Sequence, residues 1–425
     1  MSTELTGSNK KTVLTSSISI IIEWYDFSLF GFLAVVLAKL YFPSENETLS
    51  IIATYSVFAV SFIFRPLGGL ILGRIGDSVG RKNVLLLSII FITVPTVLIG
   101  LLPTYEQIGI LATILLVIFR IAQGFSIGGE RSASLSFLVE NAPENLRGVF
   151  GSVSLFSTCM GIVLASAVIS FISSILSPEQ FLSWGWRIPF LLGIANGIVA
   201  YYLKKNVSES ETFTKLKESG NIAKAPINEA LQKNWKELSL ILGITIAIAV
   251  PFYIIFIYII RHAVAFESMH ISQILKINTI DLFIITLFIP VFGYISDRVG
   301  RKPVLIIGCL SSVITSYLFF PLFSNDALMY KILIQICAGI AMSTVAGAAA
   351  PYMVESLPAR VRMSGLSLGH VIGFSIFGGS APLVATYMIK QTGDIGSPGI
   401  YLTFCCVISL TAALLIKETY KGKIS

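Results

Sequence analysis

Two related segments lie between long apolar stretches of this chain, and they limit the folds available to it. The segment at 73–82 (GRIGDSVGRK) returns at 293–302 as GYISDRVGRK, an offset of 220 positions (293 − 73). A second match, between 139–147 and 354–362, has an offset of 215 (354 − 139). Two matches in the same order predict that the chain consists of two related halves.

The apolar stretches have the length and composition of membrane-spanning helices. Hydrophobic residues make up 55% of the chain and charged residues 12%, against about 25% charged residues in a typical soluble domain. We therefore predict an all-α membrane protein of twelve transmembrane helices, in two six-helix bundles related by pseudo-two-fold symmetry. Windows of about 20 apolar residues, enough to cross a hydrocarbon core, lie at 13–38, 50–72, 83–102, 108–133, 149–173, 187–203, 239–260, 271–295, 303–323, 328–350, 363–389 and 399–416.

The basic residues predict the orientation of the bundles. With both termini in the cytoplasm, most of the 30 Lys and Arg residues fall on the inner side, as the positive-inside rule requires. The formal charge of +7 does not indicate nucleic-acid binding, because the lysines of the central segment alternate with glutamates. Residues 1–12 lack the features of a cleaved signal peptide. We expect a monomeric, multi-pass protein of a bacterial inner (plasma) membrane that contacts lipid and no nucleic acid.

A polar, charged segment divides the chain. We predict an N-terminal six-helix bundle at 1–203, a cytoplasmic linker at 204–238 and a C-terminal six-helix bundle at 239–425. Parallel six-helix repeats with a solute site at their interface are a known architecture of secondary transporters. The sequence has no phosphate-binding loop, no metal-ligand spacing among its five cysteines and no catalytic constellation. We expect no enzyme activity, no metal and no cofactor, with a proton gradient as the energy source.

The repeated loops combine acidic and basic residues at the predicted inner face. Such residues can pair across helix ends and form a gate of breakable ion pairs. Alternatively, the basic residues of the loops only anchor the topology. The predicted gating and charge-relay residues are Arg65, Asp77, Arg81, Glu140, Arg147, Asp297, Arg301, Glu355 and Arg362.

These loops resemble the signature of the major facilitator superfamily, and Arg120-x-x-Gln123-Gly124 resembles its motif on the fourth helix. Further segments resemble the metabolite:proton symporter branch, which includes proline/betaine, 2-oxoglutarate, citrate and shikimate carriers. The similarity runs nearly end to end and does not specify the solute. The segments that carry it are 23–27 (EWYDF), 65–69 (RPLGG), 123–130 (QGFSIGGE), 185–190 (GWRIPF) and 377–382 (FGGSAP).

Charged residues inside the predicted helices are concentrated in the first half. At an offset of 215, Arg120 aligns with the neutral Gln335. Charges at membrane depth are costly and mark solute or proton paths. Glu23 and Asp26 share a helix face and can face Arg120, so either one carboxylate binds a proton or both form a fixed salt bridge to it.

The candidate site residues fall into two groups. Arg120 offers a forked donor that matches a solute carboxylate, and the resemblance places an aromatic face that suits quaternary ammonium groups on the seventh helix. The histidines at 262 and 270 are expected in solvent at the outer helix ends. For proton coupling the candidates are Glu23, Asp26, Glu130 and Asp281; for substrate binding they are Arg120, Tyr25, Gln123, Tyr253 and Tyr258.

Together these features predict a proton symporter that imports a small carboxylate-bearing metabolite. The first hypothesis is a zwitterionic osmolyte such as proline or glycine betaine. The alternatives are a di- or tricarboxylate such as 2-oxoglutarate or citrate, and a non-transporting solute sensor on the same fold. The resemblance implies a long C-terminal extension in osmosensing carriers. Since this chain ends at Ser425, turgor sensing is not expected.

Overall fold

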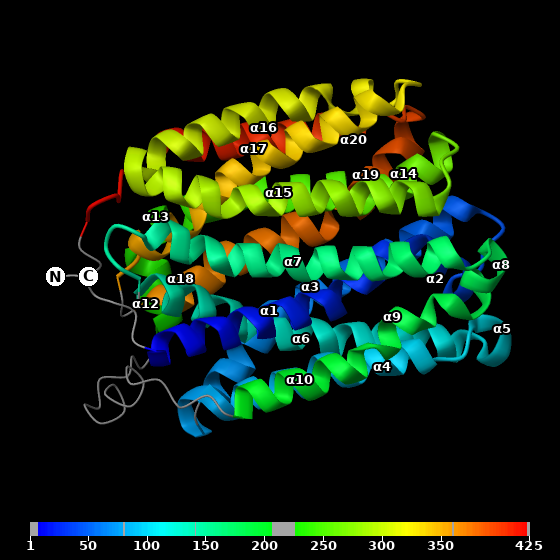
Figure 1. Cartoon of the computed structure of the whole chain (residues 1–425), viewed down its shortest axis with the longest axis horizontal. Helices are drawn as coiled ribbons and strands as arrows, with labels where there is room; N and C mark the ends of the chain where they lie inside the picture. The colour runs from blue at the N-terminus through cyan, green and yellow to red at the C-terminus, as the bar shows by residue number, and fades with distance from the viewer. Residues whose placement is uncertain (1–6, 80, 141, 206–225, 359–360, 423–425) are drawn as a thin grey trace.

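The computed structural model describes residues 7–79, 81–140, 142–205, 226–358 and 361–422, and these ranges contain no strand. Long helices run side by side along one axis (Figure 1). The first helix begins and the last one ends at the same end of this bundle (Figure 1). We call that the inner end and the opposite one the outer end, following the predicted orientation.

Twenty-three helical segments of the described residues have the following bounds. Those before the central linker are α1 (Gly7–Phe32), α2 (Ala34–Tyr41), α3 (Glu47–Val79), α4 (Arg81–Leu101), α5 (Tyr105–Ile108), α6 (Ile110–Glu140), α7 (Arg147–Ile175), α8 (Pro178–Gln180), η1 (Phe181–Gly185), α9 (Arg187–Leu191) and α10 (Gly193–Lys205). Those that follow are α12 (Pro226–Lys233), α13 (Trp235–Phe252), η2 (Tyr253–Tyr258), α14 (Ile259–Phe266), α15 (Ile271–Val299), α16 (Arg301–Phe323), α17 (Leu328–Glu355), α18 (Arg362–Leu366), η3 (Ser367–Val371), η4 (Gly373–Gly378), α19 (Gly379–Thr392) and α20 (Pro398–Leu415).

The predicted all-α membrane fold is confirmed, and each of the twelve predicted windows is helical along most of its length. Among the described residues, nine helices are long and apolar enough to cross a membrane. The pair α1 and α2, bent by 60° at its break, makes a tenth. The remaining two windows correspond to α4, in which the described residues contain the apolar stretch Ile89–Leu101, and to the interrupted pair α9 and α10.

The predicted linker lies largely outside the described residues. Of the range 204–238, the structure describes 204–205 and the part from 226 onward, where α12 is followed by the start of α13. The division into 1–203, 204–238 and 239–425 therefore stays a prediction. Below, "first half" and "second half" mean the helices before and after this segment.

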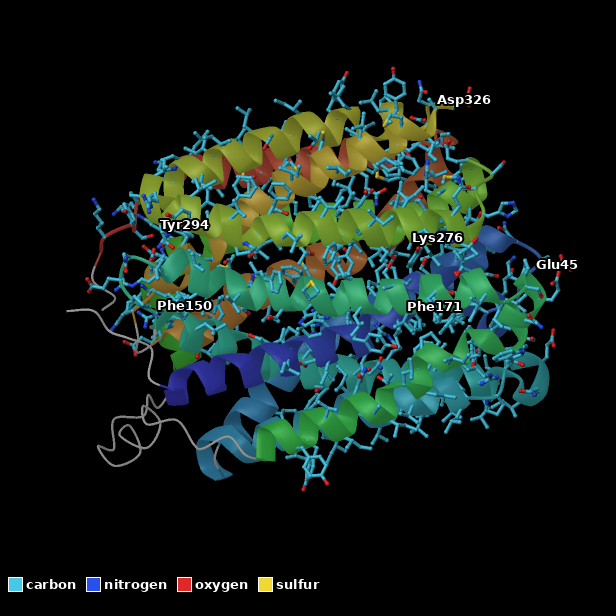
Figure 2. The ribbon with its side chains drawn as sticks, in the orientation of Figure 1. Glu45, Phe150, Phe171, Lys276, Tyr294 and Asp326 are labelled. Atoms are coloured by element: carbon cyan, nitrogen blue, oxygen red, sulfur yellow. The ribbon has the colours of Figure 1, made fainter. Side chains whose placement is uncertain are left out.

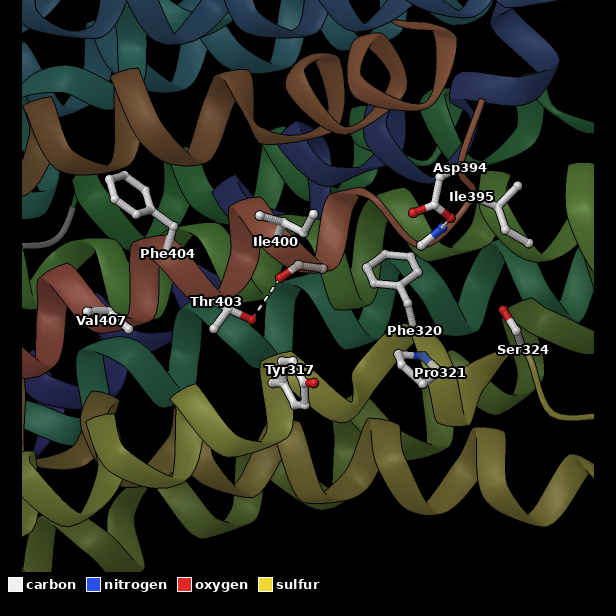
Figure 3. Close-up of a pocket in the computed structure, with 12 residues that line it drawn as sticks. Tyr317, Phe320, Pro321, Ser324, Asp394, Ile395, Ile400, Thr403, Phe404 and Val407 are labelled. Carbon is white, nitrogen blue, oxygen red and sulfur yellow. Dashed lines mark hydrogen bonds between the residues drawn. The ribbon is translucent and has the colours of Figure 1, made fainter. Parts of the chain in front are cut away.

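The sides of the bundle are apolar and its ends are polar, as a bilayer requires. Phe171 on α7 is 65% exposed on the long side of the bundle, whereas Glu45 and Asp326 lie at the outer end (Figure 2). A groove of about 630 Å³ lies between α16 and α20 on this apolar surface, with Asp394 at one end (Figure 3). Its lining contains none of the predicted site residues, and it opens on the apolar surface that a bilayer would cover.

Two crossings between the halves define where a solute site can lie. Helix α7 packs along α15 and α17, and α3 packs against α19 (Figure 1). Two further second-half helices that meet the first half contain wide π-helical turns, η2 in one and η3 and η4 in the other. Such turns occur frequently at functional sites.

Inside the first half, glycines bring α3 and α6 into backbone contact. A Cβ atom at Gly124 would lie 1.8 Å from the Ser61 carbonyl oxygen, and one at Gly128 would lie 1.8 Å from that of Arg65. Only glycine permits this approach. The crossing holds Ser61 and Arg65 directly against the helix that carries Arg120.

Candidate transport site and inner gate

Asp26 on α1 is a buried acid with an incomplete set of partners. Its side chain is fully buried (0% exposed), and its Oδ1 accepts a hydrogen bond of 3.3 Å from Asn196 Nδ2 on α10. No hydrogen-bond donor reaches Oδ2. Among the ion pairs between described residues, none includes Asp26. A carboxylate at this depth is costly, and protonation removes its charge.

Glu23 lies one turn before Asp26 but has different surroundings. It is also buried, and it interacts electrostatically with Arg65 on α3. The Arg65 guanidinium stacks on aromatic rings, with its Cζ 3.9 Å from the centroid of Phe62 and 4.4 Å from that of Phe27. Glu23 thus lies near a cation, whereas the described hydrogen-bond partner of Asp26 is the neutral Asn196.

Arg120 on α6 is fully buried and hydrogen-bonds to neutral groups rather than to either carboxylate. Its Nη1 donates to Gln123 Oε1 at 2.8 Å and its Nη2 to Ser61 Oγ at 3.0 Å. The guanidinium lies over the rings of Phe27 (4.6 Å) and Phe30 (4.4 Å). This differs from the expected pairing with the acids of α1, because the aromatic rings and amide already surround the cation.

Aromatic rings from both halves occupy the space between the two arginines. Tyr253 in η2 meets Phe58 and Phe62 of α3 edge to face, with centroid separations of 5.6 and 5.4 Å. Tyr253 also interacts electrostatically with Arg65. The structure therefore brings the predicted Tyr253 to the first-half site, while Tyr258 lies further outward beside Tyr55, at 6.4 Å between centroids.

Two other predicted substrate residues are held by internal hydrogen bonds. The Tyr25 hydroxyl donates to the Pro189 carbonyl oxygen at 3.0 Å. Gln123 accepts from Arg120 and donates through Nε2 to Thr96 Oγ1 at 2.7 Å. In this state they position α9 and Arg120.

The second half carries a neutral polar cluster where the first half carries charge. Gln335, the counterpart of Arg120, donates to Asn278 Oδ1 at 2.8 Å. Asp281 follows one turn later on α15, is 1% exposed and has no hydrogen-bond partner at Oδ2. Asp281 is thus a second buried acid, away from the α1 carboxylates.

Several predicted residues cannot be placed. The side chains of Glu130, Asp77, Arg81 and Glu140 lie outside the described residues.

At the inner end, one carboxylate joins the two halves. Asp297 on α15 accepts hydrogen bonds from the backbone N–H groups of Gly148 (2.7 Å) and Val149 (3.0 Å) at the start of α7. It also pairs with Arg301 at 2.8 Å, and Arg301 pairs with Glu355 at 3.0 Å. An acid at a helix N-terminus is stabilised by the helix dipole. We call Gly148, Asp297, Arg301 and Glu355 the inner gate.

The other two predicted gate arginines bind backbone carbonyls. Arg147 donates to the Gly422 oxygen at 2.9 Å, and Arg362 donates to those of Val354 (3.0 Å) and Leu357 (3.1 Å). All five described gate residues of the two repeats therefore lie at the inner end. Their role in gating stays a prediction.

The segment after α20 also contributes to the inner end, through Glu418, which was not among the predicted site residues. Both carboxylate oxygens of Glu418 accept backbone N–H bonds, four in all, from Arg301, Lys302, Thr419 and Tyr420. Partial burial acts to raise the pKa of Glu418, but these donors outweigh it and lower the pKa.

Glu418 should therefore contribute stability that depends on pH. Because its pKa is lower in the folded state, the contribution is present above the ordinary glutamate pKa of about 4.3 and is lost as the pH falls through the lower folded value. We expect Glu418→Gln to lower the melting temperature at neutral pH and the difference from the unmodified protein to vanish in acid. Melting curves of both proteins in detergent from neutral to acidic pH measure it, and a constant difference at every pH would contradict it.

The site contains residues that sequence reasoning missed. Asn196 and Ser61 bond the charged candidates Asp26 and Arg120. Thr96 bonds the candidate Gln123, and Asn278 bonds Gln335. Each is a small or amide side chain inside an apolar window. That signal is weak, because many such side chains only bond their own helix, as Thr54 bonds the Ser50 oxygen.

Comparison with known proteins agrees with this architecture. A family model described as sugar (and other) transporter matches residues 11–424. The glycine betaine/proline/ectoine/pipecolic acid transporter OusA of Dickeya dadantii is 32% identical over 97% of this chain and 84% of its own length. The proline/betaine transporter of Escherichia coli K12 is 31% identical with the same coverage. The shikimate transporter of Escherichia coli K12 is 32% identical over 97% of this chain and 95% of its own length.

A solved structure supports the fold independently. The proton:xylose symporter XylE, bound to 6-bromo-6-deoxy-D-glucose, superposes with a TM-score of 0.76 at 17% identity, covering 99% of this chain and 98% of the symporter chain. The predicted resemblance is thereby confirmed. The chain belongs to the sugar (and other) transporter family, and its fold is that of the major facilitator superfamily.

Proposed function

We propose that this protein is a proton-coupled symporter that takes up a zwitterionic osmolyte such as proline or glycine betaine. It would act as a monomer in a bacterial inner membrane with both termini in the cytoplasm. The relatives named above as betaine and proline transporters support this solute class. The shikimate transporter, a carrier of another carboxylate-bearing solute by its name, is similarly related.

The observation that carries the proposal is the position of the buried Arg120 beside aromatic rings that both halves provide. Arg120 forms no ion pair with any described carboxylate. Its hydrogen bonds to Gln123 and Ser61 leave Nε without a partner. A solute carboxylate would supply the missing negative charge, and a guanidinium binds carboxylates in a forked geometry.

The neighbouring rings suit the cationic end of such a solute. Arg65 already occupies this environment, since its guanidinium lies over Phe62 and Phe27. Aromatic faces attract quaternary ammonium groups in the same way. A zwitterion with a carboxylate on Arg120 and its onium group against Phe58, Phe62 or Tyr253 would place opposite charges where the site already favours them.

Asp26 would carry the coupled proton. Its fully buried carboxylate has one amide partner, Asn196, and one oxygen without a donor. Protonation from the outer side and release to the inner side would change the charge of α1 beside the solute. Glu23 is the less suitable proton carrier, because it interacts electrostatically with Arg65, whereas the described hydrogen-bond partner of Asp26 is the neutral Asn196.

Uptake into proteoliposomes tests the proposal directly. Labelled glycine betaine, proline, 2-oxoglutarate, citrate and shikimate would be supplied with and without an inward proton gradient. We expect betaine or proline to accumulate only when the gradient is present. Preference for 2-oxoglutarate or citrate would favour the di- or tricarboxylate alternative. Accumulation that ignores the gradient would refute proton symport, and binding without uptake would favour a sensor.

A substitution series at Arg120 tests its assigned role. Arg120→Lys keeps the charge but loses the fork, and Arg120→Gln loses both. Because hydrogen bonds to charged groups contribute about 1.5–3 kcal/mol, we expect Arg120→Gln to weaken solute binding by about 10- to 150-fold, with Arg120→Lys in between. Equilibrium binding of labelled solute in detergent measures this. Equal affinity in all three proteins would remove Arg120 from the binding site.

A further inference from the structure

A second buried arginine lies at the outer end of the interface between the halves. Arg261 on α14 is 7% exposed, and neither Nε nor Nη1 has a hydrogen-bond partner. Its guanidinium lies 4.7 Å from the centroid of Phe266. Among the ion pairs between described residues, none includes Arg261. The described part of the chain therefore supplies no carboxylate that pairs with this cation.

The acid nearest to Arg261 along the chain already has a cation. Glu267 pairs with Lys331 on α17 at 2.6 Å, and its other oxygen lies 3.9 Å from His262 Nε2. The expectation that His262 lies in solvent was wrong: it is fully buried, with Phe266 and Phe320 each 5.1 Å from its ring, because α14 continues the helix and turns this face inward. Of the described charged residues in this region, Glu267 and Lys331 pair with each other, and Arg261 has no ion-pair partner.

Hydroxyl groups from both halves lie around the Arg261 guanidinium. Arg261 interacts electrostatically with Tyr258, one turn earlier, and with Tyr55 on α3 of the first half. Tyr258 also interacts with Thr386 on α19. Tyr55 precedes Ser61, which binds Arg120, by six positions on the same helix, or about 9 Å along its axis. Arg261 therefore lies outward of Arg120 on the same interface.

Burying a cation without an ion-pair partner is costly, and a cation–π contact offsets only part of that cost. A carboxylate would complete the arrangement, because guanidinium N–H groups and phenolic O–H groups all donate to its oxygens. Charged residues at membrane depth that face a protein interface are functional candidates by default. The chemistry of this cluster selects an anion rather than a cation or an apolar group.

We propose that Arg261, with Tyr258 and Tyr55, forms an outer carboxylate site that the solute occupies before it reaches Arg120. This inference rests on the proposed function only in requiring a solute that carries a carboxylate. Two arginines at successive depths would hold the same carboxylate in turn. Arg261 and Tyr258 belong to the second half and Tyr55 to the first, so Tyr55 joins the outer site only while the halves are in contact at this end.

A binding experiment tests the site without knowledge of the solute. In the Arg120→Gln protein, where the central arginine is absent, sodium acetate at matched ionic strength should raise the melting temperature above that in sodium chloride. Adding Arg261→Gln should abolish that rise. A rise that persists without Arg261, or no rise in the Arg120→Gln protein, would overturn the proposal. This test is independent of whether betaine or proline is the solute.

A kinetic experiment tests the order of occupancy on the solute that the unmodified protein transports. Arg261→Gln should raise the KM for influx by about tenfold, as expected for loss of one charged hydrogen bond, with Vmax changed less than the KM. Tyr258→Phe and Tyr55→Phe, which remove only hydroxyls, should raise it less. Lys39→Gln is the matched control, because Lys39 is an exposed cation near the end of α2. An unchanged KM in Arg261→Gln, or an equal rise in Lys39→Gln, would refute the role of the outer site.

Discussion

Replacing Asp26 by Asn is expected to abolish accumulation of solute against its gradient while solute binding persists. The amide has nearly the same shape as the carboxylate and can keep the contact with Asn196, which the structure gives as 3.3 Å. It cannot take up or release a proton, so the solute flux loses its link to the proton gradient. Exchange of labelled for unlabelled solute across the membrane needs no net proton movement and should remain.

The second buried acid provides the matched control for this experiment. Asp281→Asn removes a carboxyl group of similar burial from α15 in the other half. Uptake with an imposed pH gradient and exchange without one would be measured for both variants. Accumulation by Asp26→Asn and its loss in Asp281→Asn would transfer the coupling role to the second half. Absence of uptake in the unmodified protein as well would point to a sensor.

The other large effect is expected at the inner gate, where Gly148→Ala should prevent the halves from closing. A Cβ at Gly148 would lie 2.2 Å from the Gly293 carbonyl oxygen and 2.8 Å from the Asp297 carboxylate carbon. Overpacking of this kind typically costs about 1–3 kcal/mol. That cost shifts an equilibrium between closed and open inner ends by about 5- to 150-fold. Transport should fall, because a carrier must visit both states.

The fold of each half does not depend on this contact, so the variant should remain folded and bind solute. Gly396→Ala is a suitable control, since a Cβ there would meet its nearest atom at an ordinary 3.4 Å. Labelling of a cysteine introduced at Ser61 by a membrane-impermeant reagent from the inner side would report the open state. Faster labelling in Gly148→Ala with less uptake is the expected result; unchanged labelling and uptake would show that α7 and α15 tolerate the methyl group.

Much of this architecture follows from the sequence because lipid imposes a simple rule. The twelve apolar windows became helices, since a chain in hydrocarbon must satisfy its backbone hydrogen bonds within each segment. The repeated loops predicted two halves, and they predicted Asp297, Arg301 and Glu355 at the inner face, where the structure pairs them. The comparison of the halves aligns Arg120 with the neutral Gln335, although that alignment could not show that Gln335 would bond Asn278.

The site was less predictable because it depends on contacts between distant helices. Helix spacing placed Glu23 and Asp26 on one face, but it could not distinguish Arg65 from Arg120 as the cation near Glu23. The close contact of α3 and α6 at their glycines determines the positions of both arginines, because it holds Ser61 within hydrogen-bond distance of Arg120. Likewise, Arg261 and His262 occur near a predicted helix end, where exposure is the usual outcome, and only the continuation of α14 past them buries both.

The π-helical turns of the second half bear on how such a carrier can move. Each contains one more residue per turn than an α-helix, and η2 does so between Tyr253 at the central cluster and Tyr258 at the outer one. Returning that turn to α geometry would rotate everything beyond it by about 100° and extend the axis by about 1.5 Å. The extra residue of η2 thus lies between the central and the outer aromatic clusters. A change of η2 to α geometry would turn Tyr258 relative to Tyr253 while the helix stays intact.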